Sequence, residues 1–464
     1  MILMETNGLL GVFFWGFLVV YGVIMIALSP RAVTVGGFFH GEDAKGRRAA
    51  PWLLTSSIFI SWIFAKSVTN AANLGASYGL VGGLAYATYW LSIPLAGFVI
   101  FRLRRRFGAT SLVSFLTSHY GRAAALAFTA AILIRLFNEV WSNTAVVGGY
   151  YGESGSLSFI AAALLFTAVT LAYSLRGGLR SSIVTDAAQA AIFLIALIWV
   201  LGLVLPQHSA IELASTSHWA LDSGVDLLLV AGLQVFSYPF HDPVLTDRGF
   251  ISEEKTMRRS FVIAGVLGFF SILAFSLIGV HASLVHIAVS DNVPAALAKS
   301  MGVVALLVMT VVMVSAAGST LDSTFSSLAK LAGRELPALA GHDLGRKAIG
   351  AGMAAMVVFA VLGNIPMMAG TDILKATTIS GTMVIGLAPV FILHGLIRPT
   401  WLSFHLSFWI GMALGVSLVL GWVPESWAIG EGKYALLLGA NLYGLMLCTL
   451  GYLLPGLILQ PEKC

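Results

Sequence analysis

The chain has 464 residues, of which 58% are hydrophobic and only 10% are charged, and its mean hydropathy is +0.91. A soluble domain carries about 25% charged residues, so most of this chain cannot face water. The formal net charge of +5 comes from basic residues in short loops between apolar segments, which favours a membrane topology and predicts no nucleic-acid partner. Cys448 and Cys464 have no CxxC spacing, so neither a structural disulfide nor a zinc cluster is expected.

Apolar runs long enough to cross a bilayer, about 18 residues or more, recur along the whole chain. Hydrocarbon offers backbone amides no hydrogen-bonding partner, so such runs form helices. The predicted fold class is therefore an all-α polytopic membrane protein, with residues 1–464 in a single transmembrane domain surrounded by membrane lipid. About thirteen spans are predicted, at residues 8–28, 53–78, 80–101, 123–149, 157–175, 182–204, 225–246, 258–283, 296–330, 346–364, 369–397, 402–422 and 434–458.

Arginine and lysine are concentrated in alternate loops, those after the first, third, fifth, seventh, ninth and eleventh spans. The other loops carry almost none, with Lys433 as the clear exception. Arg248 is assigned to the basic loop after the seventh span, together with Lys255, Arg258 and Arg259. The positive-inside rule then predicts a cytoplasmic (inner) membrane protein with its N-terminus outside and its C-terminus inside.

Two spans carry signals that interrupt helices. Pro51-Trp52 opens a second span of unusual polarity that runs into Gly75–Gly79, and the seventh span breaks at Ser237–Pro243, which contains two prolines. Broken helices at corresponding positions of two halves are typical of a transporter with a binding site at the bilayer midplane. The breaks stand five spans apart, which suits two inverted five-helix repeats at 53–204 and 225–397, flanked by extra helices at 8–28 and 402–458.

The ninth span carries hydroxyls and one carboxylate on a single helical face, because these residues follow i, i+4, i+7, i+8 and i+11: Ser315, Ser319, Asp322, Ser323 and Ser326. Oxygen ligands suit a hard cation. Serines also let helices pack closely and bond to their own carbonyls, so both interpretations stay open.

Asp186 lies about a turn and a half into the sixth span, after the paired glycines Gly177 and Gly178. A carboxylate at this depth is a candidate functional group. The alternative is a structural one, in which Asp186 neutralises the nearby Arg180 at the membrane interface.

The Gly-Gly-Leu turn followed by Thr185-Asp186-x-x-Gln189 resembles a hallmark of the sodium/solute symporter family. Ser319-Thr320-x-Asp322-Ser323 resembles the sodium-binding helix of that family, and Gly75-x-x-Tyr78-Gly79 resembles the end of its first core helix. The predicted topology also fits, so the resemblance covers almost the whole chain. It implies a LeuT-like fold of two inverted five-helix repeats with flanking helices.

The resemblance also implies ligands for a coupling sodium ion, and no other cofactor is expected. The main site combines hydroxyls of the ninth span with backbone carbonyls at the break of the first core helix: Ile60, Ile63, Ser319 and Thr320. Some members bind a second sodium with the acid after Gly-Gly-Leu and residues one turn along the ninth span: Asp186, Asp322 and Ser323.

Lys66 and Trp62 depart from the family pattern. Lys66 lies about one turn beyond the expected carbonyl ligands, where its ammonium group has three alternatives. It can take the cation's place, bind a substrate anion, or pair with Asp186 or Asp322. A buried lysine shifts its pKa readily, so a proton-coupled or sodium-independent carrier stays an alternative.

Arg135 and Glu139 stand at i, i+4 in the fourth span, the spacing of an ion pair on one helix. Either the pair neutralises itself, or Arg135 binds a substrate carboxylate and Glu139 is its resting partner. The other candidates for substrate binding or coupling lie in the second span and at the break of the seventh: Lys66, Ser67, Asn70 and His241.

The function predicted from these features is sodium-coupled symport of a small polar organic solute into the cytoplasm, with a carboxylate-bearing solute favoured by Lys66 and Arg135. A solute-sensing membrane protein that acts with a partner chain is a further alternative. ATP-driven transport is not expected without a GxxxxGK[ST] loop, and an enzyme is not expected without HExxH, CxxC or GxSxG. The identity of the solute and the oligomeric state stay open.

Overall fold

The computed structural model describes residues 7–288, 291–366, 380–398 and 400–458. Regular secondary structure in these ranges is helical, apart from one isolated β-bridge between His394 and Ile397. Eight helical stretches of the described chain are long and apolar enough to cross a membrane. The all-α polytopic class is therefore confirmed.

The longer helices are α1 (Asn7–Leu28), α3 (Pro51–Ser61), α4 (Ala65–Ala87), α5 (Ser92–Phe107), α7 (Arg122–Gly148), α8 (Leu157–Val204), α10 (Val225–Gln234), α12 (Glu254–Leu284), α14 (Val303–Lys330), α16 (Lys347–Leu362), α19 (Trp401–Val419) and α20 (Ala435–Ile458). The shorter helices are α2 (Val35–His40), α6 (Leu112–Tyr120), α9 (Ala210–Ser215), α11 (Pro243–Thr246), α13 (Val293–Ser300), α15 (Leu336–Leu339) and α18 (Leu387–Ile392).

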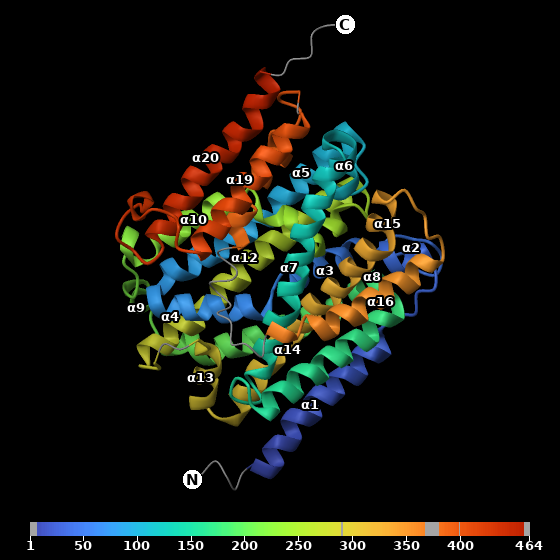
Figure 1. Ribbon diagram of the computed structural model, residues 1–464. Coiled ribbons are helices and arrows are strands. Elements are labelled where there is room, and N and C mark those ends of the chain that lie inside the picture. Colours follow the sequence, from blue (N-terminus) through green and yellow to red (C-terminus); the bar gives the residue numbers. More distant parts are fainter. Residues whose placement is uncertain (1–6, 289–290, 367–379, 399, 459–464) are drawn as a thin grey trace, which may run out of the picture.

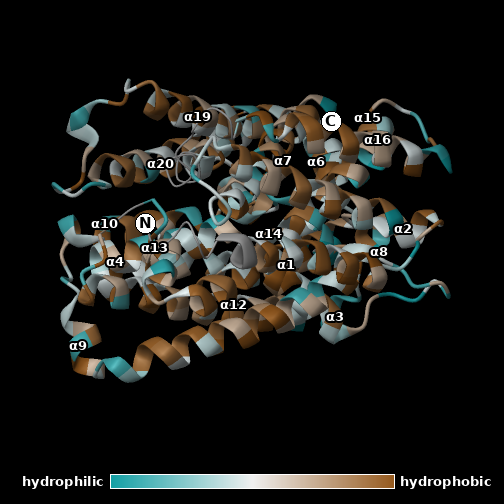
Figure 2. Ribbon diagram, turned by 90° about the horizontal axis from the view of Figure 1, so that it is seen from below, coloured by the Kyte–Doolittle hydropathy of each residue, from teal (hydrophilic) through white to brown (hydrophobic). Residues whose placement is uncertain are grey.

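Two helix pairs form the centre of the bundle, since α12 packs along α4 and α14 packs along α8. The N-terminal α1 lies along α8, and α19 packs against α20 on the opposite side of the molecule (Figure 1). Hydrophobic residues predominate along the long helices, and hydrophilic residues gather in the connecting segments (Figure 2). This distribution is the one that a lipid-embedded bundle requires.

Both predicted helix breaks are present. The second predicted span consists of α3 and the part of α4 before Gly79, and α3 and α4 are separated at Trp62–Phe64. The seventh is interrupted after α10, passes through a short 3₁₀ turn (Tyr238–His241) and resumes as α11. The two interruptions leave backbone groups outside regular helix in the middle of the bundle, which is tolerated only where protein or a cavity surrounds them.

One predicted boundary needs correction. The predicted ninth span, 296–330, is divided into α13 and α14, because Gly302 takes φ 99° between them. The turn predicted between the fifth and sixth spans is present, although α8 covers both: the backbone leaves the helix at Gly178 and bends so sharply there that Ser181 donates to the carbonyl oxygen of Tyr173, eight positions back, at 2.9 Å. Of the predicted eleventh span, 369–397, residues 369–379 lie outside the described ranges. The division into repeats at 53–204 and 225–397 stays a prediction.

The kink in α8 depends on Gly178, which adopts φ 52° and ψ −132°. A Cβ atom there would lie 2.4 Å from the carbonyl oxygen of Phe38. A residue other than glycine in such a conformation costs about 1–3 kcal/mol, so Gly178→Ala is expected to lower the thermal unfolding midpoint of the detergent-solubilised protein. Gly202→Ala is the matched control in the same helix, since nothing lies within 4 Å of its Cβ position. Equal midpoints for the two variants would contradict this explanation of the kink.

Candidate functional site

The break between α3 and α4 faces α14 across the middle of the bundle. The hydroxyl of Thr320 donates to the carbonyl oxygen of Ser61 over 3.3 Å, and both residues are fully buried. The carbonyl oxygen of Ile60 instead accepts the backbone N–H of Ile63 at 3.0 Å, which closes the end of α3. The structure thus brings the predicted break and the hydroxyl stripe together, with the carbonyl of Ser61 directed at α14.

Ser61 was missed by the sequence prediction, although it lies between Ile60 and Ile63. Its side-chain oxygen is buried and has no hydrogen-bond partner among the described residues, and the same holds for Ser315, one turn before Ser319 on α14. A buried hydroxyl without a partner carries a desolvation penalty of about 1–3 kcal/mol. Unpartnered oxygen atoms beside an interrupted helix therefore fit a site for a hard cation.

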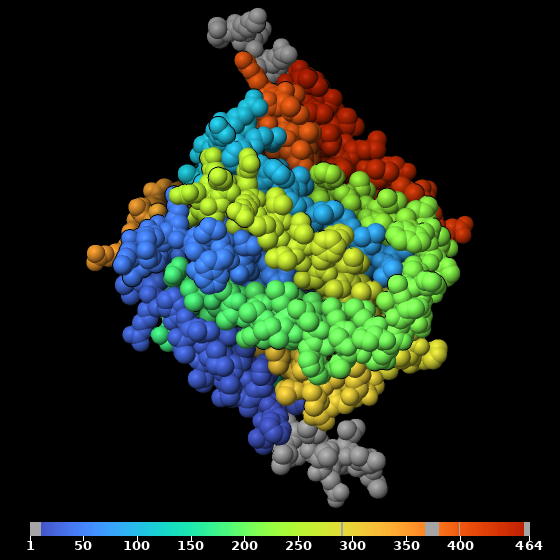
Figure 3. Space-filling model, turned by 180° about the vertical axis from the view of Figure 1, so that it is seen from behind, coloured from blue at the N-terminus to red at the C-terminus, as the bar shows by residue number. Residues whose placement is uncertain are grey.

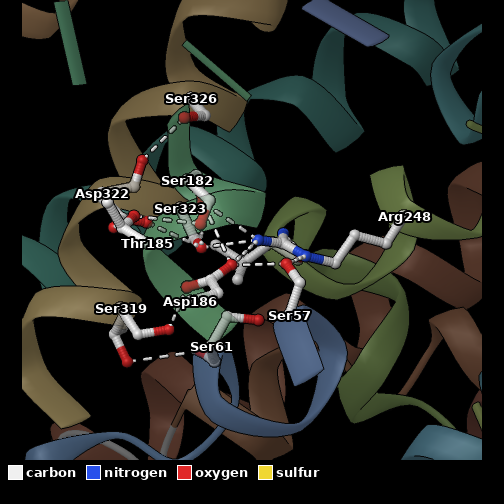
Figure 4. Close-up of polar contacts among 12 residues, drawn as sticks. Ser57, Ser61, Ser182, Thr185, Asp186, Arg248, Ser319, Asp322, Ser323 and Ser326 are labelled. Atoms are coloured by element: carbon white, nitrogen blue, oxygen red, sulfur yellow. Dashed lines mark hydrogen bonds and ion pairs between the residues drawn. The ribbon is translucent and has the colours of Figure 1, made fainter. Parts of the chain in front are cut away.

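Asp186 lies at the centre of a second polar cluster, on α8 (Figure 4). One carboxylate oxygen accepts hydrogen bonds from Ser57 at 2.5 Å and from Arg248 at 3.1 Å, and the other accepts one from Ser319. All four side chains are fully buried. Ser319 therefore links the predicted main cation site to the Asp186 carboxylate.

Arg248 lies in the predicted loop after the seventh span, between α11 and α12, but its side chain does not face solvent. Its side chain is fully buried, and its guanidinium group donates to Ser57 on α3 at 2.7 Å and to Ser323 on α14 at 2.7 Å, besides Asp186 on α8. The alternative pairing of Asp186 with Arg180 is wrong, because Arg180 donates to the carbonyl of Gly41 at 3.4 Å. One guanidinium thus connects α3, α8 and α14 to the 3₁₀ turn (Asp247–Gly249) that follows α11.

Asp322 is fully buried beside this cluster, and its described partners are hydroxyls. It accepts hydrogen bonds from Thr185 at 3.0 Å and from Ser323 at 3.3 Å. No lysine or arginine of the described chain lies within ion-pair distance of it. A buried carboxylate without a cationic partner is stable as a neutral acid or as a ligand of a bound cation.

Lys66 belongs to a separate, four-charge network together with Glu139, Arg135 and Asp242. Its ammonium group lies 2.7 Å from the Glu139 carboxylate, which also pairs with Arg135. Arg135 in turn donates to Asp242 at 2.9 Å. The predicted alternative in which Lys66 pairs with Asp186 or Asp322 is therefore wrong, and the i, i+4 pair of Arg135 and Glu139 is confirmed as part of a larger network.

The network lies between the two broken helices and is enclosed by aromatic side chains. The indole N–H of Trp62 donates to Asp242 at 2.9 Å, which explains why a large residue stands in a stretch that usually holds small ones. Cation–π contacts place Arg135 over the rings of Phe64 and Tyr238, at 5.2 and 5.3 Å. The sequence placed Asp242 beside His241 in the Pro-bounded break but gave it no role, and Tyr238 of the same break was missed.

The remaining solute candidates lie around this network. Ser67 and Asn70 both bond to the hydroxyl of Tyr86, each at 3.2 Å. His241 lines a cavity of about 30 Å³ with Arg135, and its Nε2 atom is buried without a partner among the described residues. A second cavity of about 20 Å³ is bounded by aromatic residues that include Trp62 and Tyr238. A cavity of this size holds about one water molecule, so the site must widen before it admits a solute.

These features define a class of protein: a multi-pass membrane transporter with its polar sites at two interrupted helices. Residues 44–338, more than half of the chain, match the sodium:solute symporter family. The chain belongs to this family, as the sequence motifs predicted.

Individual relatives match only part of the chain. It is 26% identical over 187 residues to sodium/glucose cotransporter 1 of Mus musculus, and the aligned region covers 38% of this chain and 27% of that protein. It is 28% identical over 190 residues to sodium/glucose cotransporter 4 of Danio rerio, and the aligned region covers 38% of this chain and 28% of that protein. The match thus spans less than a third of the length of these relatives.

Similarity to solved structures extends over almost the whole chain. A Na⁺-coupled sialic acid symporter, solved in a substrate-bound outward-open state, superimposes with a TM-score of 0.74 at 12% identity, covering 97% of this chain and 98% of that one. A transporter of the nucleobase-cation-symport-1 family, solved with bromovinylhydantoin bound, gives a TM-score of 0.55 at 13% identity, covering 90% and 95%. At such identities the similarity concerns the fold, and it confirms the predicted LeuT-like architecture.

Proposed function

We propose that this protein imports a small polar organic solute into the cytoplasm by coupling it to the inward movement of sodium across the inner membrane. In this orientation the N-terminus lies outside and the C-terminus inside, as the basic loops predict. The observation that carries the proposal is the contact of Thr320 with the broken end of α3, beside the unpartnered hydroxyl of Ser61. The sodium ligands proposed are the oxygens around this break: Ile60, Ser61, Ile63, Ser319 and Thr320.

Coupling follows from the position of these ligands. Thr320 and Ser319 belong to α14, whereas the carbonyls belong to the broken end of α3, so an ion bound between them stabilises one arrangement of the two helices. The solute site lies next to the same break, because Lys66 is in the first turn of α4. A conformation favoured by sodium then binds the solute more tightly, and differential affinity between states is what couples the two.

The proposed solute carries a carboxylate group. Lys66 and Arg135 supply two buried cations at the proposed solute site, and the planar guanidinium group of arginine matches a carboxylate with two parallel hydrogen bonds. In this conformation both cations are occupied by Glu139 and Asp242. A solute carboxylate therefore exchanges with one of these internal partners.

A second sodium site at Asp186, Asp322 and Ser323 is also proposed. Asp322 has no cationic partner among the described residues, which favours this site, but Arg248 holds both Asp186 and Ser323 in the present conformation. A second ion at this position therefore requires Arg248 to move away. The alternative coupling ion is a proton, which the buried carboxylate of Asp322 favours, since this group has no cationic partner in the described chain and can be carried in a neutral form.

The proposed function is tested by charge movement in proteoliposomes after a jump in sodium concentration, with a panel of small solutes that includes carboxylates and their amides. A sodium-evoked current that is enlarged by one solute is the expected result, and it identifies the solute class as well. A response to a pH jump without a response to sodium would replace sodium by a proton in the proposal.

Ser319→Ala is expected to raise the sodium concentration for half-maximal uptake by about tenfold, equivalent to about 1.4 kcal/mol of ion binding. Thr310→Ala is the control on the same helix, because the Thr310 hydroxyl bonds to the carbonyl of Leu306 one turn back. An unchanged sodium dependence of uptake in Ser319→Ala would remove Ser319 from the ion site.

A further inference from the structure

A large cavity opens at the periphery of the bundle, and neither Asp186 nor Lys66 lines it. Its volume is about 540 Å³, which lies within the range of about 300–1,000 Å³ typical of small-molecule sites. Its walls come from three helices, α3, the second half of α8 and the first half of α12. Figure 3 shows the face of the molecule where these segments meet, coloured blue, green and yellow-green respectively.

The lining of this cavity changes character along its length. At the end where α3 and α12 begin, it carries Lys255 and Arg259. Both basic side chains are exposed, and neither forms an ion pair with a described residue. Farther along the helices the lining is apolar, with Phe59, Leu194 and Leu267. A ligand that fits both ends has an anionic head and a hydrocarbon chain.

The neighbouring surface belongs to the lipid-facing part of the molecule. Val266 and Phe270 on α12 are 49% and 61% exposed, and Ile195 on α8 is 70% exposed. Trp52, which lines the basic end, is 64% exposed, and tryptophan is enriched at the boundary between headgroups and hydrocarbon. The cavity therefore opens toward the bilayer, with its basic end at headgroup level.

We infer that an anionic phospholipid of the cytoplasmic leaflet binds this cavity, with its phosphate on Lys255 and Arg259 and one acyl chain between α3, α8 and α12. The leaflet follows from the orientation proposed above, because α3 and α12 begin at basic loops. Basic pockets between membrane helices on this side are suited to anionic headgroups.

The bound lipid also has a mechanical consequence. It contacts α3, the half-helix that carries Ser57 and Ser61 and therefore reaches both polar clusters. Near the polar end of the cavity, Thr55 of α3 bonds to Ser260 of α12 at 2.9 Å. A lipid in this position adds to that contact and stabilises α3 in its observed position.

Native mass spectrometry of the full-length protein tests the lipid site, with dioleoylphosphatidylglycerol and dioleoylphosphatidylcholine as probes. The double variant K255Q/R259Q is expected to retain one phosphatidylglycerol fewer per chain than the wild type. The matched control is R346Q/K347Q, two exposed basic residues at the start of α16 that do not line the cavity. I263W narrows the apolar end and is expected to lower retention while both cations remain.

Equal retention of phosphatidylglycerol by K255Q/R259Q and the wild type would overturn the inference, as would equal retention of phosphatidylcholine and phosphatidylglycerol by the wild type. Thermal unfolding in detergent separates a lipid from a free anion. Phosphatidylglycerol is expected to raise the unfolding midpoint of the wild type, and soluble glycerol phosphate is not. The same rise with glycerol phosphate would show an anion site without a chain. Neither readout depends on transport, so the lipid site and the proposed symport can fail separately.

Discussion

Replacing Arg248 by methionine is expected to be among the most damaging single substitutions in the molecule. The change leaves the Asp186 carboxylate fully buried with only hydroxyl partners, and it removes the contacts to Ser57 and Ser323. Removing one partner of a buried ion pair costs about 3–5 kcal/mol. The thermal unfolding midpoint of the detergent-solubilised protein is therefore expected to fall sharply, and uptake with it.

Two further variants make this prediction specific to the ion pair. Adding Asp186→Asn to Arg248→Met removes the unpaired charge and is expected to recover part of the lost stability. Arg180→Met, the control, removes an arginine that is close in sequence to Asp186 but bonds to Gly41, so it is expected to have a small effect. If Arg180→Met lowered the unfolding midpoint as much as Arg248→Met, the assignment of Arg248 as the partner of Asp186 would be wrong.

Glu139→Gln is expected to lower the thermal unfolding midpoint about as much as Arg248→Met. Lys66 and Arg135 are then left with Asp242 as the one remaining carboxylate of the four-charge network. An unbalanced buried charge again costs about 3–5 kcal/mol. Combining Glu139→Gln with Lys66→Met restores neutrality and is expected to recover stability. Glu153→Gln, at an exposed position, is the control and is expected to behave as the wild type.

The same variant reports on the charge of the solute. A carboxylate-bearing solute supplies the negative charge that Glu139→Gln has lost, so it is expected to raise the unfolding midpoint of this variant more than that of the wild type. The corresponding amide lacks the charge and is expected to have no such preference. A panel in which amides and carboxylates stabilise Glu139→Gln equally would argue against an anionic solute.

The elements of the fold that depend on local sequence were predictable. Long apolar runs become helices because hydrocarbon leaves no alternative, and Pro239 and Pro243 mark the interruption between α10 and α11. The interruption after Ser61 contains neither proline nor glycine, and it was placed at Ile60–Ile63 by the family resemblance. The i, i+4 ion pair of Arg135 and Glu139 was predictable for the same local reason.

The partners that complete the sites were not predictable, since they come from distant parts of the chain. Lys66 and Glu139 are separated by 73 positions, and Arg248 and Asp186 by 62. Arg248 follows a proline-rich break and precedes a run of basic residues, so its sequence position is typical of a cytoplasmic loop. The contact of the Arg248 side chain with Asp186 becomes visible only in the folded structure. Trp62 was singled out as unusual, but its partner Asp242 was not found.

The separation of Arg248 from Asp186 also bears on how the chain is made. Synthesis runs from the N-terminus, so Asp186 is added to the chain 62 positions before Arg248. An acidic residue at the centre of a membrane helix costs about 2.5–3.5 kcal/mol, which is an upper limit for Asp186, two turns after Gly178, and the apolar sequence that follows it in α8 offsets this cost. Until Arg248 arrives, the hydroxyls of Ser57 and Ser182 are the partners already present for this carboxylate. Arg248 thus completes the packing of α3 and α8 only after the second half of the chain has begun to insert.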